Sequence, residues 1–267
     1  MKQRVISGIA GVILLIAVLA LGTPFVEIAV AIIAAIAAVE LSNATGLSAD
    51  KRLMITIVSG TVFLVAAQFF GNTLFMPALY IYILAIFAVY MKNMESVHLK
   101  EISVTFFLTV YVAFMFSHLI LVRNMYNGHL LVWLIFIGAF ITDTAALFGG
   151  KFFGKNKLCP KLSPKKTVEG AIGGVIGCVV ATLIYCLICQ IGFGVSPNYG
   201  YAIIIAFGAS LVSQVGDLAA SCIKRQFGIK DYGKIMPGHG GVMDRFDSIL
   251  FVAPFVYYIL IIFPIFG

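Results

Sequence analysis

The stretch PGHGGVMDRFDS, residues 237–248, runs directly into ILFVAPFVYYILIIFPIF, residues 249–266. The second segment carries no charge and, with the turn before it, is long enough to cross a bilayer as a helix of about 20 residues. The first segment places two carboxylates, Asp244 and Asp247, at the mouth of that helix, where charge is costly. These residues therefore predict a membrane fold, and the two carboxylates are candidate functional residues.

The composition of the whole chain agrees with a membrane protein. Hydrophobic residues make up 61% of the 267 positions, charged residues make up 11%, and the mean hydropathy is +1.07. A soluble domain has about a quarter of its residues charged, so this chain lacks the polar residues that a water-facing surface needs. Its five cysteines show neither metal-ligand spacing nor a disulfide framework.

Nine apolar runs have the length of a membrane span, roughly 17 to 25 residues. They lie at about residues 4–22, 25–41, 53–70, 74–91, 102–122, 130–149, 168–193, 199–221 and 246–266. We therefore predict an all-α polytopic membrane protein with about nine transmembrane helices, forming a single membrane-embedded domain over 1–267. Residues 1–101 are expected to be mainly scaffold, with Glu27 and Glu40 near helix ends where they reach water. Residues 102–267 are expected to carry the catalytic site.

The basic residues fall on one side of the predicted membrane. All but one of the 18 Lys and Arg residues lie before the first span or in the even-numbered loops, and the exception is Arg123. Because basic loops stay in the cytoplasm, the N-terminus is predicted to be cytoplasmic and the C-terminus extracytoplasmic. The expected location is the cytoplasmic (inner) membrane, with the active site facing the cytoplasm. Topology thus explains the net charge of +7, and no nucleic-acid partner is expected.

Carboxylates within or beside the later spans gather near the predicted cytoplasmic ends. Ionisable residues in membrane segments usually face a cavity or a partner and mark functional sites. Asp143 lies in the sixth span, and Glu169 opens the seventh. Asp217 lies near the inner end of the eighth, and Asp244 and Asp247 open the ninth. The site is therefore predicted at this end of the helices.

The eighth span carries a clear helical pattern. Its polar residues are spaced by four, three, four and three, which places them on one helix face; they are Ser210, Gln214, Asp217, Ser221 and Lys224. Hydrogen bonding between helices accounts for Ser210. A carboxylate in the membrane needs a cation or a proton, which favours a functional role for Asp217.

Asp244 and Asp247 are three residues apart, so on a helix they also share a face. Two close carboxylates repel each other unless a cation lies between them. Hard oxygen ligands suit Mg²⁺, which takes one or two carboxylates, waters and a substrate phosphate. The preceding glycines either form an ordinary turn or let backbone N–H groups approach phosphate oxygens. His239, among them, is a candidate acid–base group or phosphate donor.

The sixth loop contains a misleading motif. GGKFFGKN, residues 149–156, matches the spacing of a Walker A loop as far as Lys155. Asn156 stands where a Ser or Thr should hold Mg²⁺, and a predicted membrane helix precedes the motif instead of a strand. A phosphate-binding P-loop is therefore rejected.

The next stretch, SPKKTVEG at 163–170, is more informative. Thr167 is expected to cap the seventh span, since its side chain can accept a backbone N–H group of the first turn. Lys165 and Lys166 lie beside the acidic residues, which favours binding of a polyphosphate over anchoring to lipid headgroups. Glycines four apart within residues 170–177 predict close helix packing.

Together these motifs resemble the signature of the phosphatidate cytidylyltransferase (CDP-diacylglycerol synthase) family. The similarity is carried by SCIKRQFGIKDYGKIMPGHGGVMDRFDS, residues 221–248. TDTAALFGGKFFGKNKLCPKLSPKKTVEG (142–170) and QVGD (214–217) resemble the upstream blocks of the family in the correct order. The first hundred residues match only as generic membrane helices.

The resemblance implies an activity and a set of site residues. The reaction would transfer CMP from CTP to phosphatidic acid, giving CDP-diacylglycerol and pyrophosphate in phospholipid biosynthesis. Catalytic roles are implied for Asp217, Asp244, Lys224 and Asp247, and the three aspartates would hold Mg²⁺, with K⁺ as a candidate second cation. Substrate contacts are implied for Asp143, Lys165, Lys166, Ser221, Arg225, Lys230, Asp231, His239, Gly240, Gly241 and Arg245. The implied partners are CTP, phosphatidic acid, membrane lipids and a second copy in a homodimer.

Two other classes of membrane protein fit the sequence less well. A CDP-alcohol phosphotransferase needs Asp-Gly, then Ala-Arg, then two further aspartates, and neither Asp143 nor Asp217 begins such a run. A secondary transporter often has inverted repeats and a site at the membrane midplane. No repeat is found in this sequence, and its charges lie near one face, so a cytidylyltransferase is favoured over both classes.

Overall fold

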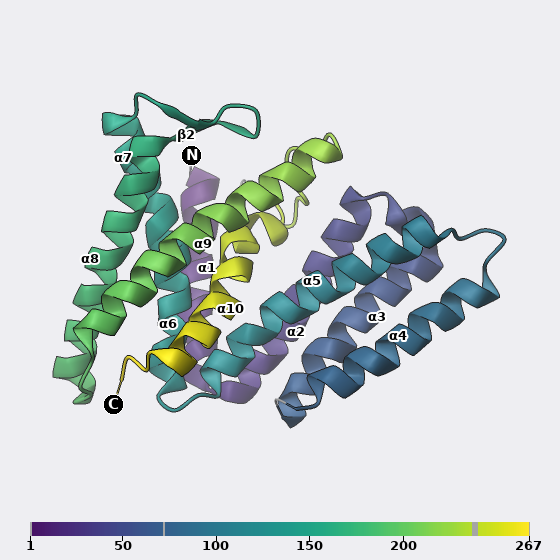
Figure 1. The fold of residues 1–267 in the computed structure, drawn as a ribbon, viewed down its shortest axis with the longest axis horizontal. Helices are drawn as coiled ribbons and strands as arrows, with labels where there is room; N and C mark the ends of the chain where they lie inside the picture. Colours follow the sequence, from purple (N-terminus) through teal and green to yellow (C-terminus); the bar gives the residue numbers. More distant parts are fainter. Residues whose placement is uncertain (1, 72, 237–239, 267) are drawn as a thin grey trace. The chain divides into compact units, whose positions relative to one another are not determined.

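The computed structural model describes residues 2–71, 73–236 and 240–266 (Figure 1). Helices dominate this part of the chain, with one β-hairpin among the described residues. The helices are α1 (Lys2–Leu21), α2 (Thr23–Ala44), α3 (Lys51–Ala67), α4 (Phe75–Lys92), α5 (Leu99–Arg123), α6 (Gly128–Phe136), α7 (Thr142–Phe153), α8 (Val168–Phe193), α9 (Tyr199–Gln226) and α10 (Met243–Ile262).

The predicted all-α membrane fold is confirmed. Within the described residues, eight helices are long and apolar enough to cross a membrane, and Gly8–Leu21 adds a shorter apolar helix. Large apolar side chains such as Ile13, Leu14 and Ile191 are exposed, as expected for surfaces that face hydrocarbon. The orientation of the termini stays a prediction from the basic loops.

The sixth predicted span is a composite of α6, a π-helical segment and α7, which together cover Gly128–Phe153. The π segment η3 spans Ile137–Ile141 and ends just before Asp143. Such segments inside helices are frequent at functional sites, because the extra residue redirects the side chains that follow. The wider turn therefore lies next to a predicted site residue.

The chain divides into two compact units. The first comprises Met1–Leu121 with Phe227–Arg245, and the second comprises Val122–Gln226 with Phe246–Gly267. The division falls inside α10, so Asp244 belongs to the first unit and Asp247 to the second. The single domain with a scaffold boundary near residue 101 stays a prediction.

In the first unit, successive helices pack against each other along the chain. α1 packs on α2, α2 on α3 and α3 on α4. Gly60 of α3 leaves room for the Tyr82 ring of α4, because a Cβ at Gly60 would overlap that ring. The Tyr82 hydroxyl donates to Oγ1 of Thr109 on α5 at 2.8 Å. A buried polar contact thus accompanies the apolar packing of α3, α4 and α5.

In the second unit, α7 packs along α8 and α8 along α9 (Figure 1). A Cβ at Gly170 would lie 2.7 Å from the carbonyl oxygen of Ala146, and a Cβ at Gly177 would lie 2.5 Å from Cβ of Ala145. These positions admit only glycine without a shift of α7 or α8. The close packing predicted from the glycine spacing is therefore confirmed.

The segment between α7 and α8 folds into a hairpin that the sequence patterns did not predict. Strands β1 (Lys157–Cys159) and β2 (Ser163–Thr167) pair in antiparallel fashion. β2 leads directly into α8, where Oγ1 of Thr167 accepts the N–H group of Gly170 at 3.1 Å. The predicted cap at Thr167 is confirmed, and it lies where the strand that carries Lys165 and Lys166 joins α8.

Candidate active site

The predicted site residues divide between the two units. The first unit carries Lys230, Asp231, Gly240, Gly241, Asp244 and Arg245. The second unit carries Asp143, Lys165, Lys166, Asp217, Ser221, Lys224, Arg225 and Asp247. His239 lies outside the described residues.

Asp244 lies in the first turn of α10 and is 8% exposed. Its Oδ2 atom accepts the backbone N–H groups of Tyr232 at 2.8 Å and Gly241 at 3.0 Å. Gly240 has a φ of +86°, and a Cβ there would lie 2.9 Å from Oδ2 of Asp244, so backbone conformation and space both require glycine. Through these hydrogen bonds, Asp244 holds the segment that precedes α10 in place. It also adds a negative charge at this position.

Glu40 also belongs to this region, although the sequence predicted a water-exposed position for it near a helix end. The expectation that it reaches water is wrong, because Glu40 is 3% exposed and its carboxylate accepts the backbone N–H groups of Val242 and Met243. The sequence did contain one signal for Glu40, because a carboxylate inside a membrane segment is a functional candidate by default. The pairing itself spans about 200 residues and leaves no local pattern.

The backbone N–H groups at the start of α10 are therefore already used within the protein. Those of Gly241, Val242 and Met243 donate to the carboxylates of Asp244 and Glu40. Phosphate binding by backbone N–H groups stays a prediction for the part of the glycine-rich stretch before Gly241.

In the second unit, the charges of three carboxylates and a lysine interact, although the carboxylates do not converge on one point. The ammonium group of Lys166 forms an ion pair with Oδ2 of Asp217, and the two side chains are 25% and 28% exposed. The charge of Asp143 interacts with those of Asp217, Asp247 and Lys166. The hydroxyl of Ser248 donates to Oδ2 of Asp143 at 3.4 Å. Acidic residues from α7, α9 and α10 thus share one electrostatic environment.

Lys165 and Lys166 differ because they are neighbours on a strand. Successive side chains of a strand point to opposite faces. Lys166 is half-buried and reaches Asp217, whereas Lys165 is exposed. Of the two predicted phosphate contacts, Lys166 belongs to the acidic cluster and Lys165 is accessible from outside it.

The polar face of α9 continues through the other predicted residues. Ser221 and Lys224 are half-buried and Arg225 is exposed, all in the last turns of the helix. Farther back, Nε2 of Gln214 donates to the carbonyl oxygen of Ala171 on α8 at 3.3 Å. The buried Oγ atom of Ser210 has no hydrogen-bond partner among the described residues, so Gln214 makes the interhelical bond that was expected of Ser210.

Asp247 is buried beside α9, with 8% of its surface exposed. A Cβ at Gly216 would lie 2.8 Å from the carbonyl oxygen of Asp247, so the absence of a side chain there permits this approach of α9 and α10.

The remaining predicted residues of the first unit are exposed; they are Lys230, Asp231 and Arg245. They are accessible to a soluble anion or to lipid headgroups.

The structure offers single carboxylates as oxygen donors for a magnesium ion. Among the described residues, no three His, Cys, Asp or Glu side chains converge as a ready metal site. Mg²⁺ needs only one or two carboxylates when waters and a substrate phosphate supply the remaining oxygens. The carboxylate of Asp217 already holds a cation, the ammonium group of Lys166. Its charge and its partial exposure therefore suit an exchangeable ion.

The Walker-like stretch does not form a phosphate loop. Residues 149–153 of the stretch belong to α7, and the backbone N–H groups of Lys155 and Asn156 donate to the carboxylate of Glu169 at 3.0 and 3.2 Å. In a P-loop such N–H groups would face phosphate oxygens. Because an anionic side chain of the protein takes that position, the rejection of a P-loop agrees with the structure.

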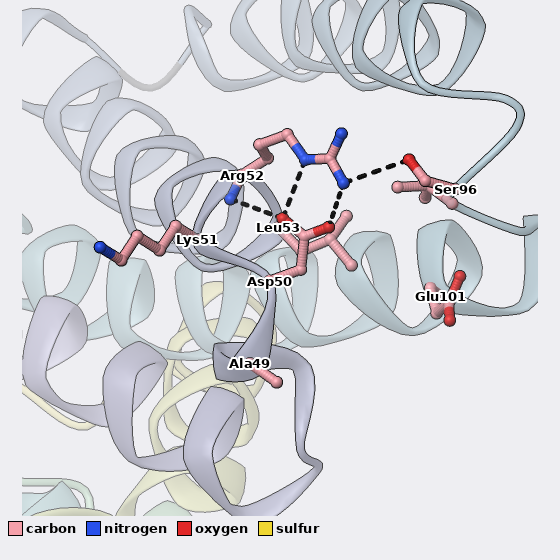
Figure 2. Close-up of a pocket in the computed structure, with 8 residues that line it drawn as sticks. Ala49, Asp50, Lys51, Arg52, Leu53, Ser96 and Glu101 are labelled. Carbon is pink, nitrogen blue, oxygen red and sulfur yellow. Dashed lines mark hydrogen bonds and ion pairs between the residues drawn. The ribbon is translucent and has the colours of Figure 1, made fainter.

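A cavity of about 460 Å³ in the first unit is lined by none of the predicted site residues (Figure 2). Its lining residues are Ala49, Asp50, Lys51, Arg52, Leu53, Ser96, Val97 and Glu101. Arg52 pairs with Oδ2 of Asp50 at 2.6 Å and donates to Oγ of Ser96 at 3.2 Å (Figure 2). The arginine thus ties the start of α3 to the segment between α4 and α5.

Comparison with known proteins gives consistent matches. The model of the cytidylyltransferase family matches residues 2–263. Phosphatidate cytidylyltransferase of Bacillus subtilis (strain 168) is 32% identical over 279 aligned positions, which cover 98% of each chain. Enzymes of the same name from Staphylococcus epidermidis and Staphylococcus saprophyticus are 34% and 36% identical. These two matches cover 52% and 47% of this chain, and 49% and 47% of the relatives.

Proposed function

This chain belongs to the cytidylyltransferase family, and from that premise we propose that it is a phosphatidate cytidylyltransferase. It would transfer CMP from CTP to phosphatidic acid and release pyrophosphate. The observation that carries the proposal is the alignment of 98% of the chain with 98% of a relative of that name. The basic and acidic residues beside membrane helices are of the kind that this reaction requires.

The chemistry brings two polyanions together. An oxygen of the lipid phosphate would attack the α-phosphorus of CTP, and the bond from that phosphorus to the bridging oxygen of the pyrophosphate group would break. The lipid phosphate is already anionic, so no side chain has to serve as nucleophile. Positioning of the two substrates and neutralisation of their charge are the main tasks of the protein.

Basic side chains of both units would bind the phosphates. Lys165 and Arg245 are exposed and Lys224 is half-buried, so all three can meet a soluble nucleotide or a lipid headgroup. The hydroxyl of Ser221, one turn before Lys224 on α9, would donate to a phosphate oxygen. Hydrogen bonds from charged donors to phosphate are among the stronger ones in proteins.

We propose further that Asp217 and Asp244 hold Mg²⁺, with Asp247 as an additional ligand or as the partner of a second cation such as K⁺. When bound, the ion would act as Lewis acid and template for the phosphates. Asp217 supports this assignment because its partly exposed carboxylate already holds a cationic side chain. Asp143 would contribute to substrate binding indirectly. Its negative charge would favour cations in the acidic cluster, and those cations would bind the phosphates.

The location and assembly are also proposals. The enzyme would lie in the inner membrane with its site facing the cytoplasm, an orientation that the basic loops support, and it would act as a homodimer. Single cysteines replacing Lys157 or Lys230 should react with an impermeant thiol reagent only from the cytoplasmic side. Reaction of both from the outer side would reverse the orientation.

The reaction is tested by pyrophosphate release from purified protein in lipid micelles. Each of the four ribonucleoside triphosphates is supplied with and without phosphatidic acid. We expect release from CTP only when phosphatidic acid is present, with the lipid product carrying CMP. Equal release from all four nucleotides, or release without the lipid, would contradict the proposed function.

A further inference from the structure

The first unit contains a buried carboxylate that holds the start of α10 from a distant part of the chain. Glu40 lies near the end of α2, and its Oε1 and Oε2 accept the N–H groups of Val242 at 2.9 Å and Met243 at 2.8 Å. Both oxygens of one carboxylate are thus engaged by consecutive backbone groups. This two-point contact fixes the orientation of the backbone as well as its distance from Glu40.

The contact performs the task of a helix cap. The first N–H groups of a helix have no acceptor within the helix, and a Ser, Thr, Asp or Asn just before it usually supplies one. Here the acceptor comes from α2. A negative charge at this end is favoured by the helix dipole, and hydrogen bonds to a charged acceptor are stronger than those between neutral groups.

Two glycines mark how closely the backbone approaches Glu40. A Cβ at Gly233 or at Gly241 would overlap the Glu40 carboxylate. Neither residue has a positive φ, so backbone conformation does not demand glycine at these two positions. The requirement for glycine comes instead from the limited space beside the Glu40 carboxylate. Two glycines of the signature stretch are therefore explained by a side chain outside it.

The Glu40 contact is continuous with the hydrogen bonds of Asp244. Gly241 donates to Asp244, and the next two residues donate to Glu40. The backbone from which Asp244 and Arg245 project is thereby held on both sides. Side-chain packing agrees, because Val242 and Met243 are 3% and 0% exposed.

We propose that Glu40 is a positioning residue for Asp244 and Arg245. This inference rests on the proposed transferase function, in which Asp244 would hold Mg²⁺ and Arg245 would bind phosphate. Glu40 itself would contact neither substrate. It would set where their side chains lie, and for such a role a misplacement of about 1 Å can lower the rate about a hundredfold.

The test measures the kcat, the KM for CTP, and the Mg²⁺ concentration for half-maximal activity. The variants are Glu40→Gln, Glu40→Asp, Gly241→Ala and the control Glu95→Gln, whose carboxylate is exposed in the segment after α4. We expect Glu40→Gln and Gly241→Ala to lose about a hundredfold in kcat, with less than about a threefold change in KM. Their Mg²⁺ requirement should rise, and Glu40→Asp should recover part of the loss. Glu95→Gln should match the unmodified protein.

A purely structural role would give a different pattern. Loss of folded protein lowers the rate without changing the Mg²⁺ requirement, and thermal unfolding of each variant measures that loss directly. Failure of Glu40→Gln and Gly241→Ala alike to fold would overturn the proposal, because Glu40 would then be needed for folding. Unmodified protein that is inactive with CTP and phosphatidic acid would refute the proposed function, whereas active Glu40→Gln would refute only this inference.

The double variant Glu40→Ala/Gly241→Ala sharpens the test. Removing the carboxylate also removes the atoms that an alanine at 241 would overlap. If the two residues act through one contact, the double variant should be no worse than Glu40→Ala alone. Multiplication of the two losses would show independent effects and contradict the proposal.

Discussion

The start of α10 in the first unit and the acidic cluster of the second unit use carboxylates in opposite ways. Glu40 and Asp244 accept backbone N–H groups, which cannot leave without moving the chain. Asp217 instead holds the ammonium group of Lys166, on a long side chain that can rotate away. Carboxylates bound to backbone N–H groups hold the chain in place, and Asp244 would combine this task with the proposed magnesium contact. A carboxylate bound to lysine can exchange one cation for another.

This difference is tested most strongly by replacing Asp217 or Asp244 with Asn. Each substitution should nearly abolish turnover, because Asn keeps the size but loses the charge that attracts Mg²⁺. Only Asp244→Asn should also lower the unfolding temperature, since Tyr232 and Gly241 lose a charged acceptor. Activity and thermal unfolding are measured on the same preparations. Equal unfolding temperatures for the two variants would show that Asp244 stabilises the fold no more than Asp217 does.

The neighbouring lysines of β2 provide a matched pair. Lys165→Ala and Lys166→Ala should each lose about a hundredfold in activity, the loss expected when a charged phosphate partner is removed. Lys166→Ala alone should lower the Mg²⁺ concentration for half-maximal activity, because no ammonium group then competes for Asp217. Magnesium titrations of both variants check this expectation. An identical Mg²⁺ requirement in the two would show that the ion pair does not oppose metal binding.

A weak effect is expected for Lys155→Ala. The Walker-like stretch uses its backbone N–H groups to bind Glu169, and the side chain of Lys155 is exposed. Activity should therefore fall by less than about threefold in the steady-state assay, well below the loss expected for a charged phosphate partner. A loss as large as that of Lys166→Ala, in a normally folded protein, would restore a phosphate-binding role to this loop.

The smallest effect concerns stability at the start of α3. The side-chain hydrogen bond from Arg52 lowers the pKa of the half-buried Asp50 carboxyl below its ordinary value. A lowered folded-state pKa stabilises the protein above the unfolded-state pKa, and this contribution disappears as the pH falls through the folded-state pKa. Asp50→Asn keeps a capping side chain but removes the charge, so it should lower the unfolding temperature slightly at neutral pH, and this difference should shrink steadily as the pH falls below about 3.9. A difference that persists at low pH would contradict this origin.

The number of helices could be predicted because length and apolarity determine a membrane span residue by residue. The glycine spacing in α8 and the cap at Thr167 could be predicted for a similar reason, since both act over a few neighbouring residues. The π segment before Asp143 and the hairpin at 157–167 could not, because neither has a strong local pattern.

The candidate site was predictable in its residue types and less so in its partners. Asp143, Asp217 and Asp247 stand out as charges near apolar runs, and the structure brings them together in the second unit. Which lysine reaches Asp217 depends on strand alternation in a hairpin that was not foreseen. The partner of Val242 and Met243 depends on tertiary packing of α2, which brings Glu40 to a segment about 200 residues later.

The central claim, that Asp217 and Asp244 serve one magnesium ion in cytidylyl transfer, is tested most directly by a double-mutant cycle. Turnover of CTP with phosphatidic acid is measured for Asp217→Asn, Asp244→Asn and the combined variant, with Mg²⁺ in excess and again in excess chelator. Residues that act as a unit are non-additive. The combined variant should therefore lose little more than either single variant, and the unmodified protein should be inactive in chelator. Multiplication of the two single losses, or full activity of the unmodified protein without divalent ions, would contradict the claim.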